Sequence, residues 1–196
     1  MPQGQSGNIP RGYPLIALGS NEPDQFGGAQ AIIRGAIKAM EGAGLSVVAT
    51  SRLYQTPCFP KGNGPDFVNA AVCVKTDLTP AALLARLHQI EETYARKRAE
   101  RWGPRTLDLD LIGWGDKMSP DVKTVERWLT LPLARQMLEA PLELILPHPR
   151  LQDRAFVLIP LAEIAPDWVH PILGKSVRQM VKALSEVEKA EIRLID

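Results

Sequence analysis

The hydrophobic pattern of the chain alternates between short apolar runs and helical repeats. An apolar run at residues 13–18 ends in Gly-Ser-Asn, which predicts a buried first strand and its turn. Apolar residues then recur at helical spacing over residues 32–40, and two glycines end that repeat. Residues 45–53 and 67–76 read as strands, separated by a loop rich in proline and glycine over residues 56–65.

A second helix and a further strand complete the predicted core. Thr79 and Pro80 form a good cap and first turn for a helix. The apolar positions of this helix form one stripe, made of Leu83, Leu84, Leu87 and Ile90. Residues 106–112 predict the next strand. The order βαββαβ predicts an α+β protein with a ferredoxin-like core, in which helices flank an antiparallel sheet.

The rest of the chain predicts mainly helices within the same domain, which we expect to span residues 13–196. Residues 117–142 form a helical insert that is broken at Pro132. Its apolar positions are Val125, Trp128, Leu129, Leu133, Met137 and Leu138. Shorter helices are expected around residues 156–164 and 177–184, followed by a helix end or a late strand over residues 186–196. Residues 1–12 lack a hydrophobic signal core and predict a disordered tail.

The run Asp108-Leu109-Asp110 carries the most specific chemistry. Two carboxylates two residues apart on a strand point to the same face. Such a pair can bind Mg²⁺ together with substrate phosphates and water, although one solvated face of an edge strand is the plainer interpretation. Arginines directly upstream favour the phosphate site, because guanidinium groups bind polyphosphate well. They are Arg96, Arg98, Arg101 and Arg105, and the alternative for each is a solvated basic loop.

Composition and charge exclude several classes of protein. The chain has 196 residues and is 45% hydrophobic, enough for one sizeable core. A net charge of +1 argues against a general binder of nucleic acid or membrane surfaces. Cys58 and Cys73 form neither a disulfide framework nor a zinc site, and a reducing cytoplasm is their natural setting. No apolar run approaches the length of a membrane span.

Five separated motifs give the chain a family resemblance that runs from about residue 16 to residue 166. They are IALGSN at 16–21, YQTP at 54–57, PDFVNAAV at 65–72, RWGPRTLDLDLI at 101–112, and PHPR at 147–150 followed by RAFVL at 154–158. In this order the motifs resemble the 6-hydroxymethyl-7,8-dihydropterin pyrophosphokinase family. Enzymes of this family move the terminal diphosphate of ATP onto a pterin alcohol in folate biosynthesis, which releases AMP.

The resemblance implies roles at the nucleotide end of the site. Asp108 and Asp110 would bind two Mg²⁺ ions that bridge the ATP phosphates. Arg96, from a mobile loop, and Arg105 are the implied catalytic arginines. The remaining implied nucleotide contacts are Glu91, Arg98, Arg101, Trp102, Ile112, His148 and Arg154. A solvated helix position for Glu91, a buried anchor for Trp102 and a surface or capping role for His148 stay open as alternatives.

The resemblance also implies a pterin pocket. Phe67 and Phe156 match the two aromatic residues that flank the ring, and Asn69 matches the residue that reads its edge. The loop whose backbone closes the pocket matches Thr56, Pro57, Cys58 and Phe59. Core packing is the alternative for each phenylalanine taken alone. Asn69 favours the pocket, because an amide on a strand face needs polar partners that a core does not supply.

The insert is the main departure from the family. Glu143 stands where relatives commonly have a basic residue, so Arg127 or Arg135 of the insert is expected to replace that cation over the nucleotide, with Glu143 paired away from the phosphates. The alternative is an insert that only packs on the outside of the domain. The sequence as a whole predicts a monomeric, cytoplasmic pyrophosphokinase that acts on small molecules, with no nucleic-acid or membrane partner. The competing interpretations are a ferredoxin-like RNA-binding or regulatory module and an Asp-X-Asp transferase with another acceptor.

Overall fold

Apolar alternation along the chain produces a sheet that is covered by helices on both faces. The computed structural model describes residues 12–21, 28–58, 64–94, 107–132, 135 and 138–195. Its strands are β1 (Pro14–Ser20), β2 (Ser46–Thr50), β3 (Tyr54–Thr56), β4 (Phe67–Lys75), β5 (Asp108–Trp114) and β6 (Arg193–Leu194). Its helices are α1 (Ala29–Gly42), α2 (Pro80–Thr93), α3 (Val122–Thr130), α5 (Ala155–Ile164), α6 (Val177–Ala183) and α7 (Glu186–Ala190), with a 3-10 turn η2 (Leu151–Asp153).

The sheet is antiparallel and has the order β5-β1-β4-β3-β6, with β2 also paired to β4. β2 and β3 follow one another along β4, because the chain breaks its strand geometry at residues 51–53 and then pairs with β4 again. The predicted α+β class and antiparallel sheet are confirmed. The expectation of a loop beginning at residue 56 missed β3, whose three residues are too short to show an alternation.

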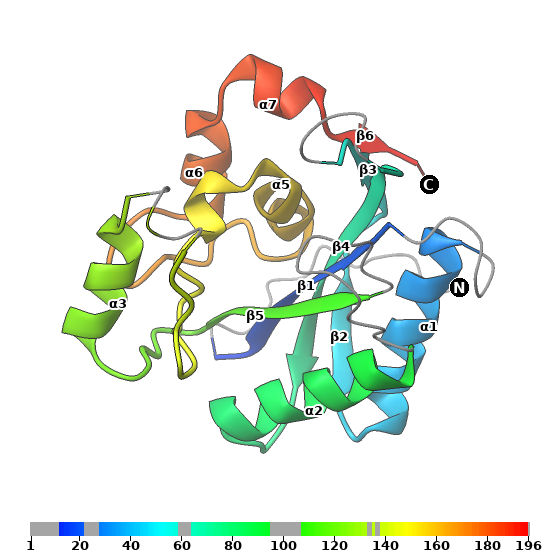
Figure 1. Ribbon diagram of the computed structural model, residues 1–196, viewed down its shortest axis with the longest axis horizontal. Coiled ribbons are helices and arrows are strands. Elements are labelled where there is room, and N and C mark those ends of the chain that lie inside the picture. The colour runs from blue at the N-terminus through cyan, green and yellow to red at the C-terminus, as the bar shows by residue number, and fades with distance from the viewer. Residues whose placement is uncertain are drawn as a thin grey trace.

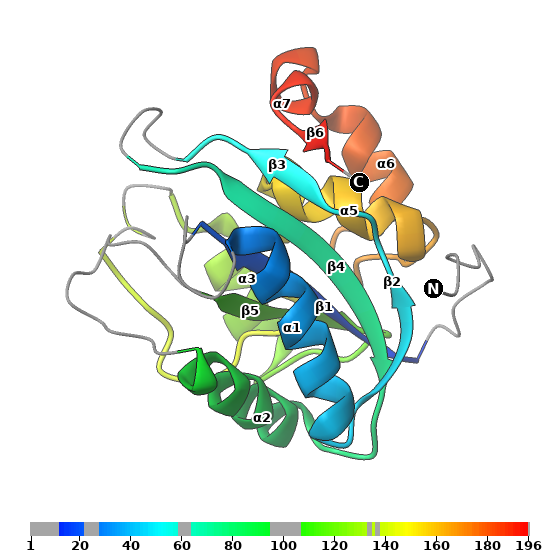
Figure 2. The same cartoon turned by 90° about the vertical axis from the view of Figure 1, so that its right-hand side faces the viewer.

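Each face of the sheet has its own hydrophobic core. Ile16, Val72 and Leu109 point to the face that α1 and α2 cover. Leu15 and Cys73, one residue away in their strands, point to the opposite face, which α5 and α6 cover. The two pairs of helices lie on opposite sides of the sheet in both views (Figure 1, Figure 2).

The predicted helix boundaries follow from local capping. The Ala82 N–H donates to the Thr79 side chain at 3.3 Å, and Pro80 stands in the first turn of α2. Capping boxes begin α6 at Ser176 and α7 at Ser185. The C-terminal segment combines both predicted alternatives, since α7 is followed by β6, which pairs with β3.

The insert contains one described helix, and its base is closed by a short bridge. α3 ends at Thr130, two residues before Pro132, as the proline predicts. Ser119 and Leu146 exchange backbone hydrogen bonds of 2.9 and 3.0 Å where the insert leaves and rejoins the domain. Leu138 was expected in the apolar stripe, but it is 76% exposed, so that prediction is wrong. Two further stripe positions, Leu133 and Met137, lie outside the described residues, as do residues 1–11 of the predicted tail.

Cys58 and Cys73 are both buried, and neither takes part in a disulfide. Among the helices that the structure describes, none combines the length and the apolar character that crossing a membrane requires.

Candidate active site

Asp108 and Asp110 share one face of β5. Leu107, Leu109 and Leu111, which alternate with them, belong to the core beneath α1 and α2. Because side chains alternate along a strand, the two carboxylates point to the other face, where α5 lies. The prediction that both point the same way is confirmed, and Asp110 keeps 37% of its side chain exposed.

A single row of paired residues connects these carboxylates to the predicted pterin pocket. Asp108 of β5 pairs with Gly19 of β1, which pairs with Asn69 of β4, which pairs with Tyr54 of β3. Directly paired residues share a face, and neighbouring strands are about 4.8 Å apart. The Cα atoms of Asp108 and Asn69 are therefore about 10 Å apart by this spacing, with only a glycine between them.

Gly19 has no side chain, so it leaves space above the sheet in the middle of this row. A Cβ atom at this position would lie 3.3 Å from the Asn69 Oδ1 atom. The same contact indicates how the amide lies, since its oxygen faces Gly19 and its nitrogen faces β3. The surface between the carboxylates and the amide is thus free of side chains at Gly19.

Asn69 is held by a buried hydrogen bond. Its Nδ2 atom donates to Thr56 Oγ1 at 2.9 Å, and both residues are buried. This bond fixes the plane of the amide. The second N–H of the amide can still donate a hydrogen bond, and its carbonyl oxygen can accept one. Phe67, half-buried, pairs with Thr56 in the adjacent row of the same face. The buried Cys58 donates to the Gly64 carbonyl at 3.1 Å, and Pro57 is half-buried between Thr56 and this cysteine.

Glu91 supports the strand that carries the carboxylates. It lies in the last turn of α2, is 3% exposed, and its Oε1 atom accepts from the Leu109 N–H at 2.8 Å. Leu109 stands between Asp108 and Asp110, so this bond fixes the backbone of the pair at the edge of the sheet. The alternative of a solvated helix position is wrong. Contact of Glu91 with a nucleotide stays a prediction.

His148 is neutral near the carboxylates. Its backbone N–H donates to the Ile112 carbonyl at 2.9 Å, and its Nδ1 atom accepts from the Arg150 N–H at 3.2 Å. Burial lowers the pKa of His148 to about 3, the charges of Arg154 and Arg150 lower it further, and Asp108 opposes them. Because Nδ1 is an acceptor, the proton of the neutral ring lies on Nε2, which can donate to an anion.

Ile112 takes part in this site through its backbone. Its side chain is fully buried in the core beneath α5. Its carbonyl accepts the bond from His148, so any contact with a nucleotide would involve main-chain atoms.

Arg154 lies between the two halves of the site. Its Nη1 atom is 3.7 Å from Asp110 Oδ2, and its Cζ atom is 5.7 Å from the centre of the Phe156 ring. Phe156, in the first turn of α5, is 38% exposed and therefore does not belong to the packed core. The two predicted ends of the site are thus linked by one guanidinium group.

A hollow of about 460 Å³ at the other end of β5 is a separate feature. Trp114, Lys117 and Trp168 are among the residues around it. Trp114 lies six residues further along β5 than Asp108, a distance of about 20 Å along the strand. The carboxylate pair and the buried amide therefore define the candidate site, and this hollow does not.

Comparison with known proteins agrees with this arrangement. The family model described as 7,8-dihydro-6-hydroxymethylpterin-pyrophosphokinase (HPPK) matches residues 15–166. The chain belongs to the HPPK family. This finding confirms the family resemblance and argues against an RNA-binding module as the explanation of the basic loop.

Two HPPK relatives give the extent of the similarity. A protein of Synechocystis sp. named 2-amino-4-hydroxy-6-hydroxymethyldihydropteridine pyrophosphokinase is 42% identical over 140 residues, which are 71% of this chain and 61% of that protein. A protein of the same name from Methylorubrum extorquens is 36% identical over 179 residues, 90% of this chain and 97% of that protein.

Solved HPPK structures share the fold. A mutant Plasmodium falciparum HPPK-DHPS crystallised with pterin and p-hydrobenzoate superimposes with a TM-score of 0.63 at 15% identity, over 94% of this chain and 48% of that chain. At this level of identity the likeness concerns the fold alone. The chain spans about half the length of these bifunctional neighbours.

Several residues predicted from the HPPK resemblance lie outside the described residues. They are Phe59, Arg96, Arg98, Arg101, Trp102 and Arg105. Their roles stay predictions. The described part of the site therefore consists of four features. They are the two carboxylates on β5, the amide of Asn69 with Thr56, His148, and the start of α5.

The two insert arginines contact a carboxylate within the insert of this HPPK chain. Arg135 Nε donates to Glu139 Oε1 at 2.6 Å, and Arg127 Nη2 is 3.7 Å from Glu139 Oε2. Both arginines are about two-thirds exposed, and Glu143 is exposed as well. The proposal that either arginine covers a nucleotide stays a prediction, and it would require that arginine to exchange Glu139 for phosphate.

Two features of this HPPK site escaped the sequence reasoning. Gly19 was assigned to a turn, but it belongs to β1 and pairs with Asn69 of β4. A solvated position was the alternative for Glu91, although Glu91 stands four residues after Leu87 and so continues the buried stripe of α2. For Glu91 the signal was this spacing, whereas the pairing of Gly19 depends on a strand far away in the sequence.

Proposed function

We propose that the chain transfers the terminal diphosphate of ATP to 6-hydroxymethyl-7,8-dihydropterin and releases AMP. The observation that carries this proposal is the row Asp108, Gly19, Asn69 on one face of the sheet. The carboxylate at one end suits the metal of a polyphosphate, and the buried amide at the other suits a flat hydrogen-bonding ring. The open glycine between them leaves room for the two substrates to meet.

The carboxylate pair fits Mg²⁺ bound together with substrate. Asp108 and Asp110 are oxygen ligands on one face, and Mg²⁺ usually takes one or two carboxylates with phosphates and water. Within the described ranges, no group of three or more His, Cys, Asp or Glu side chains gathers to hold a metal alone. This donor set suits ions whose coordination ATP completes. The two ions, when bound, would neutralise charge on the phosphate oxygens.

The groups around the carboxylates are suited to hold a diphosphate. The neutral His148 can donate its Nε2–H to a phosphate oxygen, and its lowered pKa keeps this donor unchanged across neutral pH. Arg154 already contacts both Asp110 and Phe156, so its guanidinium lies where the phosphate and pterin ends meet. Little covalent chemistry then falls to the protein, whose task is to align the attacking hydroxyl with the phosphorus and to exclude water.

The opposite end of the row is suited to the pterin. Asn69, oriented by Thr56, offers an N–H and a carbonyl oxygen to the edge of the ring. Phe67, half-buried, and the partly exposed Phe156 would supply the two aromatic faces. A site built in this way rejects ligands that lack the matching polar edge, since its own buried groups would be left unpaired.

The setting we propose is a monomer in the cytoplasm. For a monomer, sedimentation should give the mass of 21.6 kDa, and twice that mass would contradict the proposal. Cys58 and Cys73 form no disulfide, and burial raises the pKa of Cys73 to about 12. Buried thiols outside any disulfide suit a reducing compartment.

Replacement of either carboxylate tests the proposal. We expect Asp108→Ala and Asp110→Ala to remain folded and to lower AMP release by roughly a hundredfold or more, because the metal acts mainly on the transition state. Asp116→Ala is the matched control, since Asp116 is an exposed aspartate in the turn after β5. AMP release near the wild-type rate from either site variant would exclude the metal assignment.

A further inference from the structure

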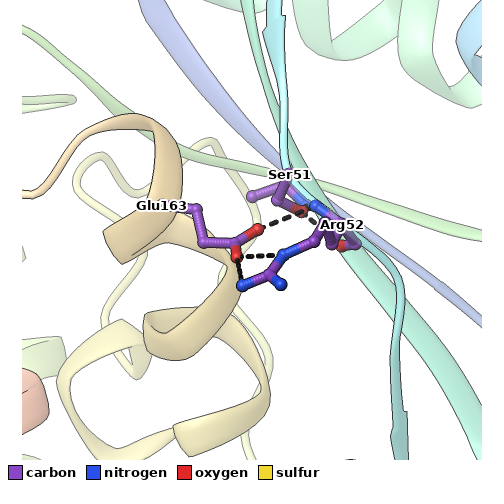
Figure 3. A network of polar contacts seen from close by, with 4 residues as sticks. Ser51, Arg52 and Glu163 are labelled. Atoms are coloured by element: carbon purple, nitrogen blue, oxygen red, sulfur yellow. Dashed lines mark hydrogen bonds and ion pairs between the residues drawn. The ribbon is translucent and has the colours of Figure 1, made fainter. Parts of the chain in front are cut away.

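A carboxylate near the end of α5 gathers donors from the junction between β2 and β3. Glu163 Oε2 accepts from the Arg52 backbone N–H at 2.8 Å, and Oε1 accepts from Arg52 Nε at 2.7 Å. Arg52 Nη2 is 2.5 Å from the same Oε1 atom. Figure 3 shows the two side chains meeting between the helix and the strand junction. One glutamate thus binds both the main chain and the side chain of Arg52.

Tyr54 adds a third group to this contact. Burial raises the pKa of Tyr54 to about 12, and a hydrogen bond to Glu163 raises it as well. Burial alone would raise the pKa of Glu163, but the hydrogen bonds from Arg52 and Tyr54 outweigh it and lower that pKa. Glu163 is therefore ionised at neutral pH and tied to the first residue of β3.

The strand junction needs this carboxylate because its own pairing is incomplete. The Ser51 hydroxyl accepts from the Ala71 N–H at 2.9 Å and donates to the Arg52 carbonyl at 2.8 Å. Beyond Ser51, the Arg52 N–H turns away from β4 and finds its acceptor on the helix. Thr56, the partner of Asn69, lies only four residues further along the chain.

The other end of α5 is attached to the carboxylate strand. Arg154, just before the helix, is 3.7 Å from Asp110 of β5. About 14 Å of helix separates Arg154 from Glu163, and three strand steps from β5 to β3 also measure about 14 Å. α5 therefore crosses the site face of the sheet with one charged contact at each end. Figure 2 shows the helix beside β3 and β4.

The first turn of α5 depends on such contacts more than an ordinary helical turn. Pro160 lies inside the helix and has no N–H to donate to the Phe156 carbonyl four residues earlier. The turn that carries Phe156 is thus less firmly bonded to the rest of the helix. Its place over the sheet therefore depends both on the contact of Arg154 with Asp110 and on where the C-terminal end of α5 is fixed.

We infer that Glu163, through Arg52 and Tyr54, is a positioning residue for the pterin pocket. By fixing α5 against the start of β3, it sets the separation between Phe156 on the helix and the Asn69–Thr56 pair on the sheet. The inference rests on the proposed pterin site. The opposing explanation is that the apolar contacts of Leu158 and Leu161, both fully buried, hold α5 unaided.

Two variants test the inference with separate ligand titrations. Glu163→Gln keeps the size of the side chain but turns an amide N–H₂ toward the Arg52 guanidinium, and Arg52→Met removes the guanidinium while leaving the backbone N–H. We expect each variant to weaken pterin binding about tenfold, as judged by calorimetry, and to change ATP binding less than twofold. The Michaelis constant for pterin should rise correspondingly, with a smaller change in kcat. Because the two changes break the same contact, the pterin affinity of the double variant should be no lower than that of the single variant with the lower affinity.

A matched ion pair elsewhere serves as the control. Arg178 and Asp167 are 3.1 Å apart on the surface near α6, and Asp167→Asn should leave both affinities unchanged. Wild-type pterin affinity in both test variants, or equal losses for pterin and ATP, would overturn the inference. If Glu163→Gln does not fold, Arg52→Met alone decides between these outcomes.

Phe156→Ala separates this inference from the proposed site. Unchanged pterin affinity in Phe156→Ala would refute the pterin site itself. A weakened Phe156→Ala together with wild-type affinity in Arg52→Met and Glu163→Gln would refute only the positioning role.

Discussion

Replacing Asn69 with alanine should separate pterin binding from ATP binding. The wild-type amide is 4% exposed and uses one N–H on Thr56, which leaves one N–H and one carbonyl oxygen for the ligand. Two such bonds contribute about 1 kcal/mol each, and buried polar groups of the ligand left unpaired cost about 1–3 kcal/mol more. A total of about 3–5 kcal/mol corresponds to roughly a 140- to 4,000-fold loss of pterin affinity.

The same replacement should also lower stability. Alanine leaves the buried Thr56 hydroxyl oxygen without its donor, which costs about 1–3 kcal/mol. For a domain of this size each kcal/mol lowers Tm by about 2–4 °C. Binding must therefore be measured well below the midpoint of the variant, which a thermal melt provides.

Calorimetric titrations with ATP and with the pterin give the decisive comparison. We expect the ATP affinity of Asn69→Ala to stay within about threefold of wild type, because the amide is about 10 Å from the Asp108 backbone by strand spacing. Gln55→Ala is the control, since Gln55 precedes Thr56 on the opposite strand face and its side chain binds the exposed Asp66 at 2.9 Å. Equal losses for both ligands in Asn69→Ala would refute the assignment of this amide to the pterin.

Three further changes test the surroundings of the site. Gly19→Ala places a methyl 3.3 Å from Asn69 Oδ1, so pterin affinity should fall several-fold while ATP affinity is kept. An unaltered pterin affinity would mean that the site tolerates a side chain at this position. Glu91→Ala leaves the Leu109 N–H unpaired, which should cost about 1–3 kcal/mol in unfolding free energy and weaken apparent Mg²⁺ affinity, whereas Glu91→Gln keeps an acceptor and should lose less. His148 should stay neutral with its proton on Nε2 from pH 5 to 8 in nitrogen NMR spectra, and a titration midpoint above pH 5 would contradict its lowered pKa. The pKa of His148 in the folded chain, about 3, lies below its ordinary value of 6.5, so the unfolded chain takes up the proton at higher pH than the folded chain does. This group therefore lowers the free energy of unfolding as the pH falls from 6.5 toward 3. His148→Gln should make the free energy of unfolding depend less on pH in that range.

Patterns with a regular period gave the most accurate sequence predictions. The alternation around Asp108 and Asp110 predicted their shared face, because the leucines between them had to point into a core. The cap at Thr79 and the apolar stripe of α2 predicted that helix from its first turn. In each case local spacing alone decides the geometry.

The errors occurred where a partner lies far away in the sequence. β3 has only three residues, it pairs with a strand that begins more than ten residues later, and the junction before it bonds to Glu163, more than a hundred residues later. The spacing of Glu91 to Leu87 indicates its buried position, but it does not indicate that the carboxylate accepts from the Leu109 N–H of β5. Leu138 matched a helical repeat, but in the structure its side chain is largely exposed.

The most direct test of diphosphate transfer is the identity of the nucleotide product. The full chain would be incubated with ATP, Mg²⁺ and 6-hydroxymethyl-7,8-dihydropterin, and the products would be separated and followed by phosphorus NMR. The site geometry predicts AMP and a pterin diphosphate in equal amounts, formed only when the pterin is present. Release of ADP with a pterin monophosphate, or AMP formation that does not depend on the pterin, would contradict it.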